Sequence, residues 1–129
     1  MTIQQHILLQ KLQFEPYPIP FKSEKAFTAW FWKKIHDRWW FWHKISDQSQ
    51  NYKPCDSIFW IDWFCWLVEI KYWKETRNVN VSKKLRRNQQ FALERYQKNG
   101  WQSIVIYYSQ PLHKYRIMEY SKDMKLNLK

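Results

Sequence analysis

Glycine is almost absent from this chain of 129 residues, which contains one glycine and ten tryptophans. Glycine usually makes up about 7% of residues and is favoured in tight turns and at helix C-termini. Trp63 follows Asp62 between two strand-like runs, and Trp39 follows a helical stretch, so both stand where glycine is expected. Two hypotheses stay open: the protein is tryptophan-rich by nature, or a reassigned UGA codon was translated under the wrong code. The intact mass of the protein from its native source distinguishes them.

Cysteine and histidine are few and scattered. Cys55 and Cys65 have neither a metal-ligand spacing nor the pattern of a disulfide framework. The four histidines lack the i, i+4 or Cys-paired arrangement of a zinc site. We therefore expect small buried or half-buried thiols and no zinc.

Long apolar runs are also missing. No segment offers roughly twenty apolar residues without charge, and the amino terminus has no basic-then-apolar signal pattern. We therefore expect a cytoplasmic protein that does not span a membrane. The length predicts one domain, residues 1–129, with an N-terminal arm (1–20) and a basic tail (121–129).

Acidic residues are outnumbered by basic ones. Eleven Asp and Glu against 22 Lys and Arg leave a net charge of +11 with neutral histidine. Such an imbalance is expected of a protein whose partner is a polyanion. Nucleic acid is the favoured partner, ahead of an anionic membrane surface.

The hydrophobic pattern predicts the order helix, three strands, helix, strand. Ser23 is the expected N-cap of a helix ending near Asp37, whose apolar face includes Phe27 and Phe31. Gly100 is the expected C′ residue of the second long helix. The predicted strands are 40–45, 57–61 and 64–73, which form an antiparallel meander, then 101–108 and an edge strand 115–120; the second long helix is predicted over 82–99.

Three charged residues lie in or beside these strands. Glu69 and Lys71 are two apart in the apolar run 64–73, so both side chains leave the same face of one strand. Burying such a pair is costly unless the two groups compensate each other or hold another charged species. Asp56 begins the preceding strand and can face Glu69 across the hairpin. Two carboxylates and a lysine are typical of metal-assisted phosphodiester hydrolysis.

This pattern resembles the PD-(D/E)XK nuclease superfamily. The segments HKISD (43–47) and KPCD (53–56), the strand with Glu69 and Lys71, and a basic helix with Gln89 are similar to small Holliday junction resolvases and recombination U-type members. The resemblance covers about residues 23–108. It implies an α/β protein with a restriction-endonuclease-like αβββαβ core, in which helices flank a central mixed sheet.

The resemblance also implies a metal site. Asp56, Glu69 and the backbone carbonyl of Ile70 would bind Mg²⁺ or Mn²⁺. Lys71 would orient the attacking water, help to deprotonate it and neutralise charge on the phosphorane. The alternative for Lys71 is an ordinary solvated strand lysine.

Two further residues have competing interpretations. Glu24 is the helix-one acid of the family by position, an outer ligand through water or for a second ion, but an acid in a first helical turn is also favoured by the helix dipole. Gln89 would orient water or touch a phosphate, or instead satisfy a hydrogen bond in the core. The expected DNA-binding residues are Lys44, Lys83, Lys84, Arg86 and Arg87.

The sequence therefore predicts a Mg²⁺-dependent DNA endonuclease acting on branched DNA, as in Holliday junction resolution, and working as a homodimer. A restriction-type or mobile-element nuclease of the same fold is a second possibility. A non-catalytic nucleic-acid-binding protein is the alternative from another class, since basic and aromatic residues also suit base stacking.

Overall fold

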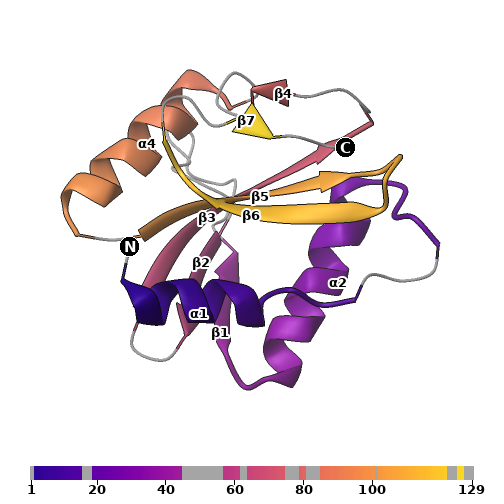
Figure 1. Ribbon diagram of the computed structural model, residues 1–129, viewed down its shortest axis with the longest axis horizontal. Helices are drawn as coiled ribbons and strands as arrows, with labels where there is room; N and C mark the ends of the chain where they lie inside the picture. Colours follow the sequence, from indigo (N-terminus) through magenta and orange to yellow (C-terminus); the bar gives the residue numbers. More distant parts are fainter. Residues whose placement is uncertain are drawn as a thin grey trace.

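A five-stranded mixed sheet runs through the centre of the protein, with helices on both faces (Figure 1). The computed structural model describes residues 2–15, 19–44, 57–61, 64–74, 79–80, 85–100, 102–121 and 125–126. The sheet consists of β1 (Phe41–Lys44), β2 (Ser57–Ile61), β3 (Phe64–Trp73), β5 (Gln102–Ser109) and β6 (Lys114–Glu119), in the order β1-β2-β3-β5-β6. The described residues form three helices beside it: α1 (Ile3–Lys11), α2 (Glu24–Asp37) and α4 (Arg87–Lys98).

The connections between these elements confirm the predicted αβββαβ order. β1, β2 and β3 form an antiparallel meander, and β6 pairs antiparallel with β5 at the opposite edge. β3 and β5 are parallel, and α4 is the crossover between them. A parallel pair requires such a crossover, because a tight hairpin can join only antiparallel strands.

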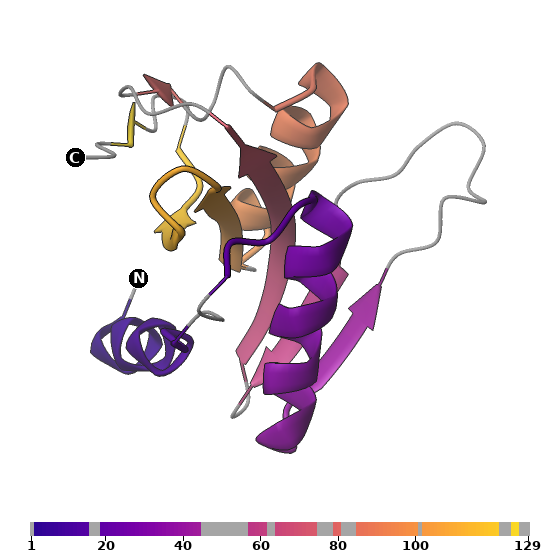
Figure 2. The same ribbon diagram turned by 90° about the vertical axis from the view of Figure 1, so that its right-hand side faces the viewer.

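Side chains of β3 alternate between two buried layers. Trp66, Val68 and Ile70 pack in a cluster with residues of α1 and α2. Leu67 instead packs with Leu93 of α4 in a second cluster. α2 and α4 therefore lie on opposite faces of the sheet (Figure 2). A strand buried on both faces is an almost continuous apolar run, which is why the bounds of β3 could be predicted.

The predicted start and apolar face of α2 are confirmed. The Ser23 hydroxyl accepts a hydrogen bond from the backbone N–H of Ala26 at 3.1 Å, which satisfies one of the unpaired donors at the helix start. The helix buries four large side chains against the sheet: Phe27, Trp30, Phe31 and Ile35.

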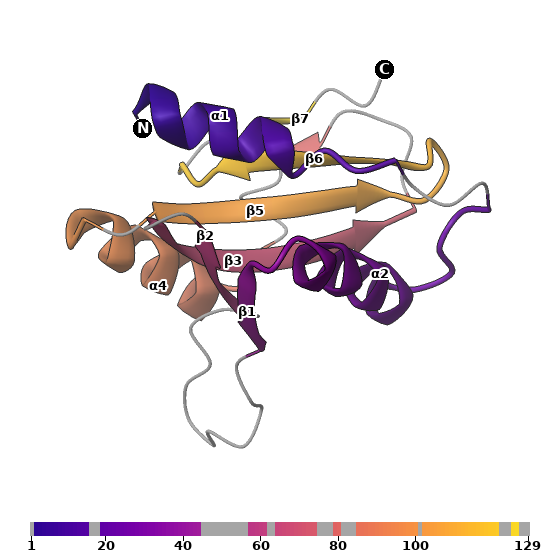
Figure 3. The same cartoon turned by 90° about the horizontal axis from the view of Figure 1, so that it is seen from below.

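The segment expected to be an N-terminal arm contains α1, which lies over β6 (Figure 3). Leu8 and Leu12 of this helix are buried in the α2-side core. The buried Tyr115 hydroxyl of β6 donates to the Leu12 carbonyl at 2.7 Å and accepts from the backbone N–H of Phe14. Burial raises the pKa of this hydroxyl, so it stays protonated and keeps the donor. Helix α1 is thus attached to the sheet by packing and by hydrogen bonds.

Two other segments differ from expectation. Val79–Asn80 (β4), between the predicted third strand and second long helix, pairs with Lys125–Leu126 (β7) of the predicted tail as a short antiparallel ladder. Helix α4 begins at Arg87, later than the predicted start at residue 82, which lies outside the described residues. Across the described ranges, no helix is both long enough and apolar enough to span a bilayer.

Both long helices end with a residue in the left-handed conformation. After α4 this residue is Gly100, with φ +88°, and its N–H donates to the Gln97 carbonyl at 3.1 Å. After α2 it is Trp39, with φ +63°, and its N–H donates to the His36 carbonyl at 2.9 Å. Trp39 therefore occupies the structural position that glycine occupies after α4. The other tryptophan at an expected glycine position, Trp63, lies outside the described residues.

This geometry predicts that Trp39→Gly stabilises the protein. A non-glycine residue in the left-handed region costs roughly 1 kcal/mol, and Trp39 is 96% exposed, so its removal loses little packing. Thermal unfolding should show a gain of about 1 kcal/mol. Trp32→Gly, within α2, is the matched control and should cost about 1 kcal/mol, since glycine is unfavourable in a helix interior. An unchanged or lowered stability of Trp39→Gly would contradict the strain at this position.

Candidate active site

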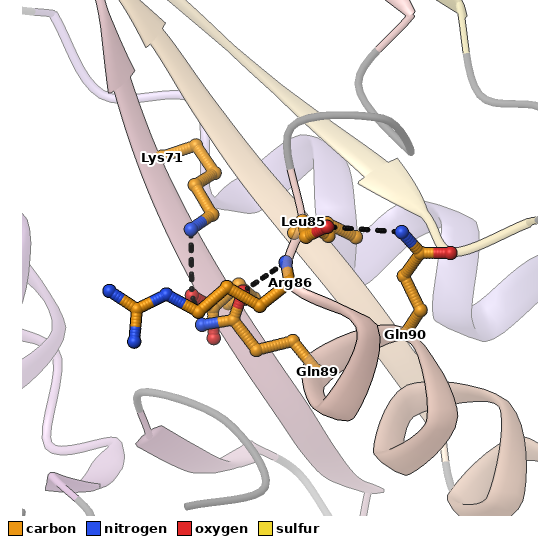
Figure 4. Close-up of polar contacts among 6 residues, drawn as sticks. Lys71, Leu85, Arg86, Gln89 and Gln90 are labelled. Carbon is orange, nitrogen blue, oxygen red and sulfur yellow. Dashed lines mark hydrogen bonds and ion pairs between the residues drawn. The ribbon is translucent and has the colours of Figure 1, made fainter.

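A buried carboxylate and a lysine lie together on one face of β3. The distance between Lys71 Nζ and Glu69 Oε1 is 3.5 Å, and the side chains are 16% and 2% exposed (Figure 4). The structure confirms the predicted same-face arrangement. An ionised carboxylate removed from water needs compensation, and the lysine supplies an opposite charge at short range.

Gln89 of α4 is the second partner of this carboxylate. Its amide Nε2 donates to Glu69 Oε1 at 2.8 Å, while its Oε1 accepts from the backbone N–H of Arg86 at 2.9 Å (Figure 4). The two bonds use opposite ends of one amide. Gln89 thus caps the first turn of α4 and connects that turn to Glu69.

The start of α4 is held against the sheet by the residues around Gln89. Leu85 is buried in the α4-side cluster, and its carbonyl accepts from Gln90 Nε2 at 3.0 Å. These contacts set the position of the first turn relative to β3. The bond from Gln89 to Glu69 also favours Gln89 as a positioning residue, in addition to the two roles considered from the sequence.

Basic side chains stand at the same end of α4. Arg86 and Arg87 are exposed at the helix N-terminus, where the helix dipole already favours an anion. Lys44 is the last residue of β1 and pairs with Ser57, but its side chain lies outside the described part of the chain. Lys83 and Lys84 are likewise outside it.

Asp56 also lies outside the described residues. The last described pair of the β2–β3 ladder joins Ser57 to Val68. In the sequence Asp56 directly precedes Ser57, and Glu69 directly follows Val68. Ile70, whose backbone carbonyl was the third expected metal ligand, has its side chain buried on the α2 side of β3.

Glu24 begins α2, which packs on the sheet face opposite Glu69. Its side chain is exposed. Glu24 lies three residues before the buried Phe27, a spacing that would place both side chains on one face of the helix. The carbonyl of Phe21, three residues before Glu24, accepts a hydrogen bond from the Tyr72 hydroxyl at 2.7 Å. This bond places the start of α2 near the C-terminal end of β3. Glu24 therefore begins a helix near the strand end that carries Lys71.

The described residues fit a hard divalent cation in one respect. Glu69 provides a buried carboxylate, and carboxylate oxygens are the protein ligands that Mg²⁺ prefers. No group of three or more His, Cys, Asp or Glu side chains suitable for a metal occurs within the described ranges, which exclude Asp56. The capping bond of Gln89 was not predicted from the sequence, because the N-cap is Arg86 and not the Ser or Thr that marks a capping box.

The order of elements and the mixed sheet define a restriction-endonuclease-like, nuclease-type fold. The structure is similar to that of Hjc, a Holliday junction resolvase from the archaeal hyperthermophile Archaeoglobus fulgidus, with a TM-score of 0.57. The two chains are 16% identical, and the match covers 78% of this chain and 84% of Hjc. No protein-family model and no curated protein sequence matches this chain. At this identity the similarity establishes the fold.

Proposed function

We propose that this protein is a divalent-metal-dependent DNA endonuclease that acts on branched DNA. The observation that carries the proposal is the buried Glu69 paired with Lys71 on a core strand, next to the basic N-terminus of α4. The alternative, an ordinary solvated strand lysine, does not describe a side chain that is 16% exposed and lies 3.5 Å from a buried carboxylate. The nuclease-type fold, whose structural neighbour is a junction resolvase, supports the same reaction class.

In the proposed site, Glu69, Asp56 and the backbone carbonyl of Ile70 hold Mg²⁺ or Mn²⁺. The ion would supply a polarised water and neutralise charge on the phosphate. Lys71, whose Nζ lies 3.5 Å from Glu69 Oε1, would donate a hydrogen bond to the attacking water and stabilise negative charge beside it. Gln89 keeps the Glu69 carboxylate in one orientation, because its amide is itself held by the helix cap. Glu24 is proposed as an outer acid, acting through water or on a second ion.

The proposed substrate is a four-way junction bound by a homodimer. A twofold-symmetric protein suits a junction, because two equivalent sites then face two equivalent strands. A net charge of +11 per chain provides basic surface for several DNA arms. A linear duplex would engage only part of that surface.

The substrate proposal predicts tighter binding and paired cleavage of a junction. At physiological salt a fixed four-way junction should bind more tightly than its component duplex, and Mg²⁺ should produce paired nicks on opposing strands near the crossover. Equal cleavage of the duplex, or scattered cuts on one strand, would contradict junction resolution while leaving the nuclease proposal intact. Binding with no cleavage in Mg²⁺ or Mn²⁺ would instead favour the non-catalytic binding protein.

Arg86 and Arg87 provide a test of the DNA path. If both contact phosphates, replacing both with alanine should weaken binding to every DNA sequence alike. A plot of log K against log salt should become less steep by about one unit per lost contact. The matched control is Lys114→Ala with Arg116→Ala, which removes two exposed charges from β6. An unchanged slope for the α4 variant would place the DNA elsewhere.

A further inference from the structure

Aromatic side chains are exposed on the outer part of the sheet, where β1 pairs with β2. Phe41 and Trp60 are register partners on these strands and are 53% and 55% exposed. The rings of Phe41 and His43 lie parallel, with centroids 6.3 Å apart and an interplanar angle of 9°. We call Phe41, His43 and Trp60 the aromatic face.

The aromatic face belongs to the same side of the sheet as Glu69. On β1 and β2 the intervening Trp42 and Phe59 are buried in the opposite, α2-side core. Ile58 of β2 pairs with Leu67 of β3 and packs in the α4-side cluster. Leu67 and Glu69 are two apart on β3, so they share this side. This side of the sheet therefore runs from Glu69 through the buried Leu67 and the half-buried Ile58 to the exposed rings.

Among the described residues, no helix packs over these rings. Helix α4 packs on β5 and β3, and the exposure of Phe41 and Trp60 shows that its cover ends before β1. Exposed aromatic side chains on a sheet are unusual, because removing large apolar groups from water lowers the free energy of the protein. Their position indicates a surface that contacts a partner.

A second copy of this chain does not suit the aromatic face. A stable protein interface buries about 800 Å² on each partner, far more than three side chains provide. The net charge of +11 per chain instead attracts nucleic acid.

Rings displayed on a sheet are the arrangement by which proteins stack unpaired bases. Bases of an intact duplex are stacked on one another and do not offer their faces to such a ring. From these observations we infer that the aromatic face binds unpaired bases next to the phosphodiester held at Glu69. This inference rests on the proposed function and narrows its substrate to branched DNA in which nucleotides near the cleavage point are unpaired when the protein is bound.

The test compares binding to paired and unpaired DNA. The full chain carries Glu69→Gln so that the DNA stays intact, and its affinity is measured by fluorescence anisotropy at physiological salt. One probe is a duplex, and the other is the same duplex interrupted by a short single-stranded gap. Phe41→Ala and Trp60→Ala are each expected to weaken binding to the gapped DNA about tenfold, in line with the loss of one stacked base, and to change duplex binding by less than about twofold.

Two controls keep this result specific. Trp32→Ala removes an exposed ring from α2, on the opposite side of the sheet, and should leave both affinities unchanged. Replacing the gap nucleotides with abasic sites should remove the advantage of the wild-type aromatic face while keeping the phosphates. Phe41→Tyr keeps an aromatic ring and should bind the gapped DNA as tightly as wild type does. That result would show that the weaker binding of Phe41→Ala comes from the lost ring and not from unfolding.

Three outcomes would overturn the inference. They are equal losses on duplex and gapped DNA, no loss on either, and a dimer-to-monomer shift in sedimentation caused by Phe41→Ala, which would assign the face to a second copy. Failure of the proposed nuclease function gives a different result: the aromatic variants lose gapped-DNA binding, but the chain with wild-type Glu69 cleaves neither of these probes and no four-way junction in Mg²⁺.

Discussion

Replacing Glu69 with Gln is expected to lower Mg²⁺-dependent cleavage by at least about a thousandfold, because the variant loses the buried negative charge that would hold the metal. The side chain keeps its size, and its carbonyl oxygen can still accept from Gln89. DNA affinity should stay within a few fold of wild type, since basic residues elsewhere supply most of the binding energy. Asp56→Ala should have the same effect on cleavage.

Cleavage of a labelled junction, followed with Mg²⁺ and with EDTA, measures this loss. Glu119→Gln is the matched control, since it neutralises an exposed acid on β6 and should leave activity unchanged. Wild-type activity in the Glu69 variant, with contaminating nuclease excluded, would refute the assignment of the active site.

Replacing Lys71 with Met is expected to reduce both cleavage and stability. Cleavage should fall by about a hundredfold or more, because the group proposed to hold the water and neutralise developing charge is removed. The free energy of unfolding should fall by about 1–3 kcal/mol, because the buried Glu69 carboxylate loses its compensating charge. The double variant Glu69→Gln, Lys71→Met should recover most of that stability while remaining inactive.

Denaturant unfolding of wild type, both single variants and the double variant gives the coupling energy between the two side chains. Lys98→Met is the control, since Lys98 Nζ lies at the same 3.5 Å from Glu94 Oε1 but the side chains are 75% and 31% exposed. That exposed pair should contribute no more than about 0.5 kcal/mol. An equally small coupling between Glu69 and Lys71 would mean that burial does not strengthen their interaction.

Local pattern was sufficient for much of the sheet and for the central pair of the site. The bounds predicted for β2 and β3 agree with the structure, because both strands are apolar runs ended by turn-forming or polar residues. The common face of Glu69 and Lys71 follows from the two-residue period of a strand, whatever packs around it. The N-cap role of Ser23 is likewise determined within one helical turn.

The helix termini show where local pattern was insufficient. A left-handed residue after α2 could be anticipated at Trp39 from its position, but only the backbone established its φ of +63°. The start of α4 at Arg87 is decided by the burial of Leu85 and by the capping bond of Gln89, neither of which a run of basic residues reveals. Basic residues are compatible with both helix and loop.

By itself, the sequence determined the order of the elements, the mixed α/β class and the pairing of an acid with a lysine on a core strand. Only the tertiary structure decided that Gln89 bonds to Glu69, that α1 docks on β6 through Tyr115, and that the exposed rings of β1 and β2 share the face of Glu69. The physical reason is the range of the interactions. Strand alternation and helix capping act within a few residues, whereas Gln89 and Glu69 are 20 residues apart and Tyr115 and Leu12 are 103 apart, so these contacts form only when the parallel crossover and the docked helix bring distant segments together.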